Sequence, residues 1–461
     1  MVSDPRAARF AARHPRVWRG LERVDAAGRW LAIRLATNPR AQWCAFGVLL
    51  GIRVIALVLM MIVRDGPDGI GDERWLYLEH VRDTATFGFA NPGYHKAQAM
   101  WHAPMSYLFW AGALSLTSPT IEAGRIIALA LYLCSALVWV LIVRLLFPRG
   151  QRVLPAALFW VAPAWHTIEI RAYGLFLLLV LATTYLTLVP LMVTDARVKA
   201  LALLGLAGSL ALLVFNHLYG IVGIGCVGLA GLGMVLGGHR RRLGLGYMLC
   251  AIFAVATSIP WLATLAHDRR VLLPVVTAER EASVTEAATR GLVDRENVDQ
   301  YKVNAFSTWE SLRDELASDL RVNVATVALL AFAARTWIRG GAKRRLWAAV
   351  GIVLALSARN TLPQVAALAW MARRGAAWRG WGMQWVPVLL LGSFPAIFRY
   401  PAFYENYLTG YRVLPFLLFA DVLREERWDW PARIALLHIA GLSLELVHWM
   451  TADPLHGWMP S

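Results

Sequence analysis

Residues 121–152 read IEAGRIIALALYLCSALVWVLIVRLLFPRGQR, and this stretch sets the pattern for the chain. Its first part, 121–147, is almost wholly apolar and exceeds the roughly 20 residues that a helix needs to cross a bilayer. Arg149 and Arg152 follow at once, and basic side chains in short loops stay on the cytoplasmic side of a membrane. The stretch therefore predicts a membrane-spanning helix that ends at the inner face.

The composition excludes the common classes of soluble protein. The chain has 461 residues, of which 58% are hydrophobic and 16% charged, and its mean hydropathy is +0.50. Soluble domains have about 45–50% apolar and about 25% charged residues, because a globule needs a polar surface. A soluble enzyme, a disordered protein and a secreted disulfide scaffold are therefore excluded. The four cysteines lie inside apolar stretches, which is typical of small buried residues and not of disulfides or metal ligands.

Further apolar segments predict an all-α polytopic membrane protein with about 13 transmembrane helices. The expected spans are 41–63, 121–147, 153–168, 172–193, 200–216, 219–237, 244–264, 322–338, 346–358, 362–372, 384–398, 412–423 and 433–450. Basic clusters follow every second span, which places the N-terminus in the cytoplasm and the C-terminus outside. Counting the short apolar segment 103–118 as a span would move Arg149 and Arg152 outside. We therefore expect 103–118 to be an interfacial or half-inserted helix on the outer face.

The spans and loops divide the chain into four expected parts. These are a basic cytoplasmic segment 1–40, a transmembrane module 41–264 with a first outer loop 64–120, a large outer loop 265–321, and C-terminal transmembrane helices 322–461. The predicted cytoplasmic segments hold 26 basic and seven acidic side chains, an excess larger than the formal net charge of +16 for the whole chain. The basic surplus is thus an orientation signal, and it does not indicate a nucleic-acid surface.

The first candidate site lies in the outer loop after the first span, in the stretch Asp72-Glu73-Arg74-Trp75-Leu76-Tyr77. Gly69 and Gly71 precede an expected amphipathic surface helix, and Asp72 lies near its start. The positive end of a helix favours a carboxylate at this place. The residues alone leave two interpretations with about equal weight, a helix N-cap or a general base that must be ionised to accept a proton.

Three more clusters lie at the outer ends of predicted spans. They are the segment from Trp165 to Tyr173, which contains Glu169 and Arg171, the segment from Phe215 to Gly220, which contains His217 and Tyr219, and the segment from Tyr404 to Arg412. An interfacial ion pair, a hydrogen-bonded histidine and a topology anchor are the ordinary interpretations of such residues. Arg171 or Arg412 could instead hold a lipid phosphate, because a guanidinium pairs with phosphate through two hydrogen bonds. No nucleotide-binding, serine-hydrolase or metal-ligand motif accompanies these clusters.

This ordered set of motifs resembles the GT-C fold glycosyltransferases that use lipid-phosphosugar donors. It is most similar to bacterial members of glycosyltransferase family 39, of the protein mannosyltransferase and aminoarabinose transferase kind. Asp72-Glu73 matches the family's acidic pair, and Glu169, Arg171 and Tyr173 match its second-loop pattern. His102-Ala103-Pro104-Met105 departs from the family's His-Pro-Pro-Leu at two positions. The resemblance covers residues 41–240, and the rest matches only in topology and at Arg412–Pro415.

The resemblance implies a hexosyl- or pentosyltransferase of the cell inner membrane that works on the outer, periplasmic face. A sugar would pass with inversion from a polyprenyl-phosphate donor to a hydroxyl or phosphate of a glycan, lipid or protein acceptor. The implied catalytic residues are Asp72 as general base, Glu73 and Glu169. The implied substrate-binding residues are Lys96, His102, Arg171, Tyr173, His217, Tyr219 and Arg412. The resemblance implies no divalent metal, no cofactor other than the lipid-linked donor, and no nucleic-acid partner.

Two other functions stay open at this stage. A transporter or flippase for lipid-linked sugars would have charges or broken helices near the midplane in two matching halves, and we see no such symmetry. A ligase or polymerase that uses lipid-diphosphate donors would depend on arginine and histidine in a large outer loop, such as 265–321. The sequence names neither the sugar nor the acceptor.

Overall fold

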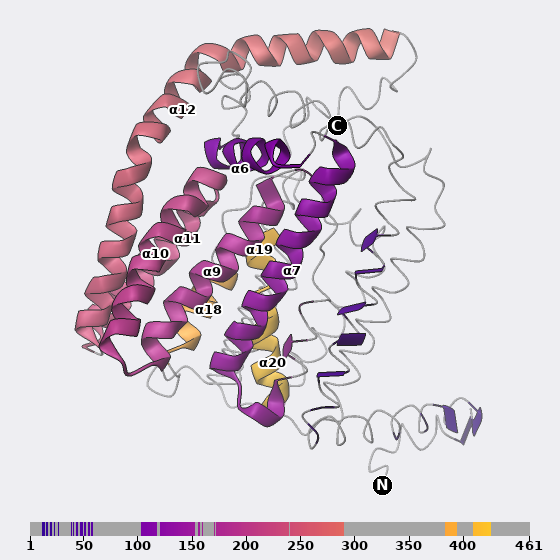
Figure 1. Ribbon diagram of the computed structural model, residues 1–461, viewed down its shortest axis with the longest axis vertical. Coiled ribbons are helices and arrows are strands. Elements are labelled where there is room, and N and C mark those ends of the chain that lie inside the picture. The colour runs from indigo at the N-terminus through magenta and orange to yellow at the C-terminus, as the bar shows by residue number, and fades with distance from the viewer. Residues whose placement is uncertain are drawn as a thin grey trace.

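The computed structural model describes single residues and pairs between 12 and 58, and then 103–117, 120–152, 155–156, 159, 170, 172–238, 240–289, 383–393 and 409–425. The regular elements in these ranges are helices (Figure 1). They are α6 (Pro104–Ser115), α7 (Ile121–Leu146), the 3-10 helix η3 (Arg149–Gln151), α9 (Ala172–Met192), α10 (Ala196–Asn216), α11 (Gly220–Leu236), α12 (Arg241–Thr289), α18 (Trp385–Ser393), α19 (Thr409–Arg412) and α20 (Pro415–Glu425).

Four described helices are long and apolar enough to cross a membrane. They are Ile121–Leu146, Ala172–Met192, Ala196–Asn216 and Arg241–Asp268, with hydropathies of 2.8, 2.2, 2.2 and 1.9. They coincide with four predicted spans, while the predicted span 219–237 is the shorter apolar helix α11. The other predicted spans lie wholly or partly outside the described residues, and their number stays a prediction.

The surfaces of these helices also fit a membrane. Leu201 and Leu204 on α10 are 68% and 72% exposed, and Leu249 and Ile252 on α12 are 65% and 60% exposed. Repeated exposure of large apolar side chains along neighbouring helices is unfavourable in water, but it is the expected outer surface of helices packed in lipid. The chain is therefore a membrane protein.

Helix α6 lies crosswise to the long helices, over one of their ends (Figure 1). Its 12 residues span about 18 Å at 1.5 Å per residue, well short of the roughly 30 Å of a bilayer core. Proline at its first turn starts the helix after Ala103, where a missing backbone N–H costs nothing. Residues 104–115 of the expected interfacial segment 103–118 thus form a short helix, and its place on the outer face of the membrane stays a prediction.

Arginine side chains cap the C-terminal ends of helices at the end of the bundle opposite α6. The Arg152 guanidinium donates to the carbonyls of Phe147 and Arg144, at 2.9 and 3.0 Å, where α7 ends. Arg240, which precedes α12, donates to the Leu191 carbonyl of α9 at 2.7 Å. The last carbonyls of a helix lack partners and carry a partial negative charge, so cations are favourable there. Two of the basic clusters that predict orientation thus also cap helices.

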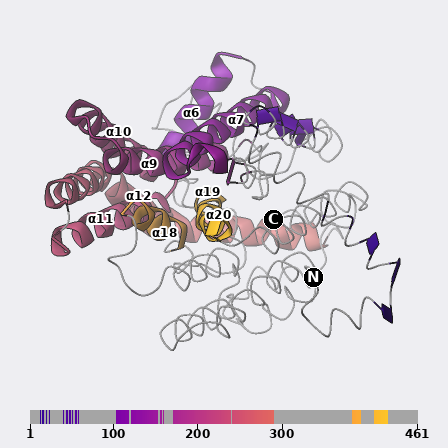
Figure 2. The same ribbon diagram turned by 90° about the horizontal axis from the view of Figure 1, so that it is seen from below.

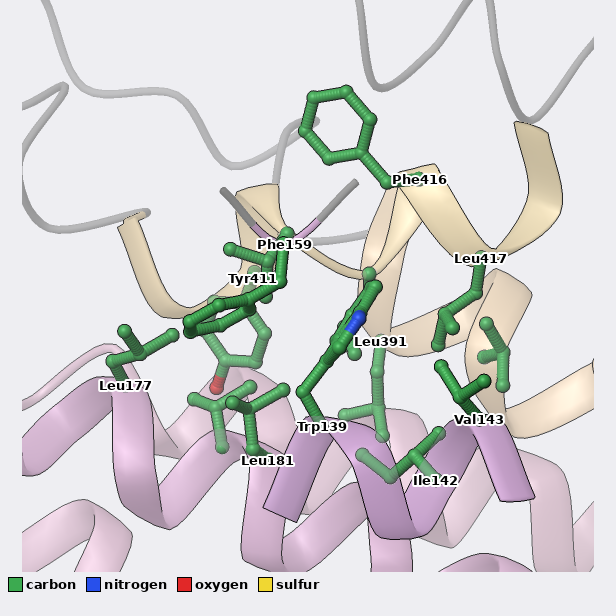
Figure 3. Packing of buried hydrophobic residues seen from close by; sticks show 14 of the residues in the cluster. Trp139, Ile142, Val143, Phe159, Leu177, Leu181, Leu391, Tyr411, Phe416 and Leu417 are labelled. Atoms are coloured by element: carbon green, nitrogen blue, oxygen red, sulfur yellow. The ribbon is translucent and has the colours of Figure 1, made fainter. Parts of the chain in front are cut away.

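Helices from distant parts of the sequence share one hydrophobic core. Trp139 of α7 packs with Leu177 of α9, Leu391 of α18 and Leu417 of α20 (Figure 3). Viewed from below, α18, α19 and α20 lie on one side of α9 and α10 lies on the other (Figure 2). The described C-terminal segments therefore pack directly against the N-terminal helices.

A second core joins α10, α11 and α12, and buried hydroxyl groups link these helices to α9. The Thr183 hydroxyl of α9 donates to the Ser209 hydroxyl of α10 at 3.2 Å, and the Tyr247 hydroxyl of α12 donates to the Thr187 carbonyl. Bonds of this kind hold membrane helices together because lipid offers no alternative partners. The group of α9 to α12 is thus fixed by both packing and hydrogen bonds.

Helix α12 is longer than the span 244–264 that hydropathy predicts. It runs from Arg241 to Thr289, so the first part of the predicted outer loop 265–321 is helical. Figure 1 shows that α12 bends and that its C-terminal part runs crosswise above α6. Residues 290–321 lie outside the described part of the chain.

Candidate functional site

The turn between α10 and α11 holds His217 in a buried position. Helix α10 ends at Asn216, and His217 adopts an extended backbone while its N–H still donates to the Leu213 carbonyl at 3.0 Å. Gly220 completes the turn by donating to the His217 carbonyl at 2.8 Å. A Cβ at Gly220 would lie 2.5 Å from the Leu213 carbonyl, so no larger residue fits. His217 is 7% exposed as a result.

Aromatic rings from α9 and from the same turn surround the His217 ring. The ring centroid of Phe176 lies 5.2 Å away, that of Tyr219 is stacked at 5.7 Å, and that of Tyr173 lies at 6.3 Å. The Nδ1 atom of His217 accepts from the Tyr219 backbone N–H at 3.3 Å. When the ring is neutral, its proton must therefore sit on Nε2, which makes Nε2 a donor. Three predicted substrate-binding residues, Tyr173, His217 and Tyr219, thus come together.

Tyr411, from the C-terminal cluster, contacts the same turn between α10 and α11. Its hydroxyl donates to the Tyr219 carbonyl at 3.0 Å, and its ring meets Phe176 edge-on at 5.5 Å. Gly223 of α11 makes room, because a Cβ there would lie 2.8 Å from the Tyr411 hydroxyl oxygen. The predicted clusters around His217 and Tyr411 therefore meet. Arg412 ends α19, and its side chain lies outside the described residues.

The start of α9 is anchored on both sides of the predicted Arg171. Ile170 is fully buried and packs with α6 and α7 around Tyr107 and Ile121. The Ala172 carbonyl accepts from the Asn216 side-chain Nδ2 at 3.1 Å, which ties α9 to α10. Near Ile170, the Arg125 side chain of α7 is 5% exposed, a buried cation to which the sequence pattern assigns no role. An ionisable residue buried in a membrane helix is a functional candidate by default.

In the part of the chain that the structure describes, Oδ1 of Asn216 and Nε1 of Trp261 are buried polar atoms without a hydrogen-bond partner. Asn216 is 0% exposed and Trp261, whose ring lies 6.0 Å from Phe215, is 7% exposed. The sequence assigns a function to neither residue. The structure reveals both as candidates, because they are buried without hydrogen bonds while most buried polar groups in proteins are paired.

The predicted site residues in the outer loops are not placed by the structure. Asp72, Glu73, Lys96, His102, Glu169 and Arg171 lie outside the described residues, so their roles stay predictions. Within the described part of the chain, no three His, Cys, Asp or Glu side chains form a group that could hold a metal ion. What the structure describes of the site is its aromatic and histidine wall.

Comparison with known proteins finds structural likeness only. No protein-family model matches the chain, and no curated protein sequence matches it significantly. One similar structure is the archaeal oligosaccharyltransferase AglB from Archaeoglobus fulgidus in complex with an inhibitory peptide and a dolichol-phosphate. It has 13% identity and a TM-score of 0.49 over 87% of this chain and 56% of that chain.

Two more structures of the Archaeoglobus fulgidus oligosaccharyltransferase are similar to the chain. The apo form has 13% identity and a TM-score of 0.47 over 88% of this chain and 52% of that chain. The form tethered to an acceptor peptide with the NVT sequon has 12% identity and a TM-score of 0.49 over 89% and 55%. The chain spans about half the length of these proteins, and TM-scores below 0.5 do not establish a shared fold.

Proposed function

We propose that the protein is a membrane glycosyltransferase that moves a hexose or pentose from a polyprenyl-phosphate donor to an acceptor hydroxyl or phosphate. The observation that carries this proposal is the wall formed by Tyr173 of α9 with His217 and Tyr219 of the turn between α10 and α11, at the end of the bundle away from Arg152 and Arg240. Aromatic rings can pack against the apolar face of a sugar.

The reaction is a single displacement at the anomeric carbon. Asp72 takes the proton of the acceptor, and the acceptor oxygen forms a bond to the anomeric carbon with inversion. The bond from that carbon to the phosphate oxygen breaks, and the polyprenyl phosphate leaves with the electron pair. Arg171, Arg412, Lys96 and His102 balance the charge of the leaving phosphate, while Glu73 and Glu169 position the reactants. Such electrostatic help is strongest where water is excluded.

The proposal locates the reaction at the outer face of the inner membrane, and labelling tests this location. Gln151, the last residue of η3, is exposed, and the His267 side chain on α12 is 74% exposed. In a variant without the four native cysteines, we expect a cysteine at 267 to react with a membrane-impermeant maleimide in intact spheroplasts. A cysteine at 151 should react only after the membrane is permeabilised. Labelling of both positions from one side, or the reverse pattern, would contradict the topology.

A transfer assay tests the activity itself. The purified protein in nanodiscs is given undecaprenyl phosphate that carries radiolabelled glucose, mannose, galactose or arabinose, with the envelope fraction of the source cells as acceptor. We expect at least one donor to lose its sugar to a larger product and to release undecaprenyl phosphate in equal amount. If labelled lipid crosses the bilayer of proteoliposomes but no donor in the panel transfers its sugar, the protein is a transporter and the proposal is wrong.

A further inference from the structure

The side-chain amide of Asn216 has a fixed orientation at the end of α10. Its Nδ2 donates to the Ala172 carbonyl at 3.1 Å, so turning the amide over would bring two oxygens together. The Oδ1 atom therefore points away from Ala172. The residue is 0% exposed, and Oδ1 has no hydrogen-bond partner. The structure thus holds one buried acceptor in a defined direction.

An unsatisfied buried oxygen of this kind is costly. Leaving a polar group buried without a partner costs about 1–3 kcal/mol, whereas an apolar side chain of similar shape would cost nothing. Exceptions in folded proteins call for an explanation such as a bound water or a functional group. The next residue in the chain is His217, whose ring is packed by Tyr173, Phe176 and Tyr219. The unpaired oxygen therefore belongs to the residue that directly precedes His217, and the same side chain bonds to Ala172, which directly precedes Tyr173.

We infer that Asn216 determines sugar specificity by accepting a hydrogen bond from one hydroxyl group of the donor sugar. This inference rests on the proposed function and names a residue of the same site. An amide oxygen can only accept, so it cannot bind the oxygens of an ionised phosphate, which also only accept. A hydroxyl donor is small enough to reach a buried oxygen, and sugars carry several. A site built to bond a substrate hydroxyl rejects analogues that lack it.

Thermal unfolding with three lipids tests this inference in the full-length protein. The probes are undecaprenyl phosphate, undecaprenyl-phosphate glucose and undecaprenyl-phosphate galactose, whose sugars differ in the orientation of one hydroxyl. We expect one sugar lipid to raise the Tm of the unaltered protein more than undecaprenyl phosphate does. In Asn216→Ala this extra shift should disappear, and the Kd for that lipid should rise about tenfold, the effect of one hydrogen bond. The shift caused by undecaprenyl phosphate alone should be unchanged.

Two further variants separate binding from folding. Asn216→Asp has the same size, and its neutral carboxyl can donate to the Ala172 carbonyl and still offer an acceptor, so part of the extra shift should return. Ser209→Ala removes the bond between Ser209 and Thr183 on the same helix, away from the turn. It should lower the Tm of the free protein and leave the extra shift intact.

The outcomes distinguish the inference from the proposed function. If neither sugar lipid stabilises the unaltered protein beyond undecaprenyl phosphate, the inference is wrong, whereas the transfer assay with all four sugars decides the proposed function. If the extra shift occurs and survives in a folded Asn216→Ala protein, the proposed function stands, and Asn216 binds only water or nothing. If Ser209→Ala also abolishes the extra shift, the effect comes from helix packing and the assignment to Asn216 is wrong.

Discussion

Gly231→Ala should destabilise the protein by about 3 kcal/mol, although it adds a single methyl group. Helices α11 and α12 touch through their backbones at Gly231 and Gly244. A Cβ at Gly231 would lie 2.6 Å from the Gly244 carbonyl oxygen and 3.0 Å from the Tyr247 Cβ. Backbone atoms cannot turn aside as a flexible side chain can, so the two helices must separate. Overpacking of a close interface costs about 1–3 kcal/mol, and a collision with backbone belongs at the upper end.

The chain offers a matched control on the same helix. Gly233 lies two residues further along α11, and a Cβ there would meet nothing within 4 Å. Gly233→Ala has the same change in helix propensity and should leave the Tm unchanged or slightly raised. The measurement is thermal unfolding in detergent, followed by circular dichroism and by the loss of the monodisperse elution peak. Equal Tm values for Gly231→Ala and Gly233→Ala would show that α11 and α12 do not pack through this contact.

Asp72→Asn should lower the turnover of sugar transfer by about 10²- to 10⁴-fold, the usual contribution of a general base. The amide has the size of the carboxylate but cannot accept the acceptor's proton. Binding of the polyprenyl-phosphate donor should persist, because the base acts on the acceptor. The measurement is single-turnover transfer with a radiolabelled donor in nanodiscs, together with the thermal shift that the same donor produces. The expected variant is therefore folded, able to bind its donor and almost inactive.

The control for Asp72 comes from the same outer loop. Asp68 lies four residues earlier in the same acidic loop. It is not part of the motif that resembles the glycosyltransferases. Asp68→Asn removes the same charge and should keep most of the activity. A folded Asp72→Asn protein with full transfer would exclude Asp72 as the base. Equal losses of activity in both variants would mean that transfer depends on the negative charge of the loop and not on proton transfer to Asp72.

Helix boundaries illustrate what hydropathy can and cannot predict. The spans predicted for α7 and α9 agree with the structure within a few residues, because their apolar runs end where charged residues begin. Helix α12 instead continues to Thr289, well past the end of its apolar run. The polar stretch that follows is rich in alanine and glutamate, which favour helix in water as well. Hydropathy marks where lipid contact ends, and not where hydrogen bonding along the helix ends.

The candidate site likewise contains some residues that the sequence predicts and others that only the structure reveals. Its tyrosines and its histidine stand out in the sequence because they lie at the outer ends of predicted spans. Asn216 lies inside the predicted cluster around His217, but the sequence assigns no role to it or to Trp261, because an asparagine beside a turn and a tryptophan near a span end are ordinary. Their unmet hydrogen bonds depend on which atoms surround them. Neither local propensity nor hydropathy contains that information.

The sequence by itself determined that this is a helical membrane protein, and it predicts the direction of its helices. Both follow from quantities that add up along the chain, the apolar length of each helix and the positions of Arg149 and Arg152. Only the tertiary structure decided that Tyr411 bonds to Tyr219, whose ring stacks on His217. The reason is that partners between helices depend on which faces meet, and side chains 192 positions apart come together only once the helices have packed.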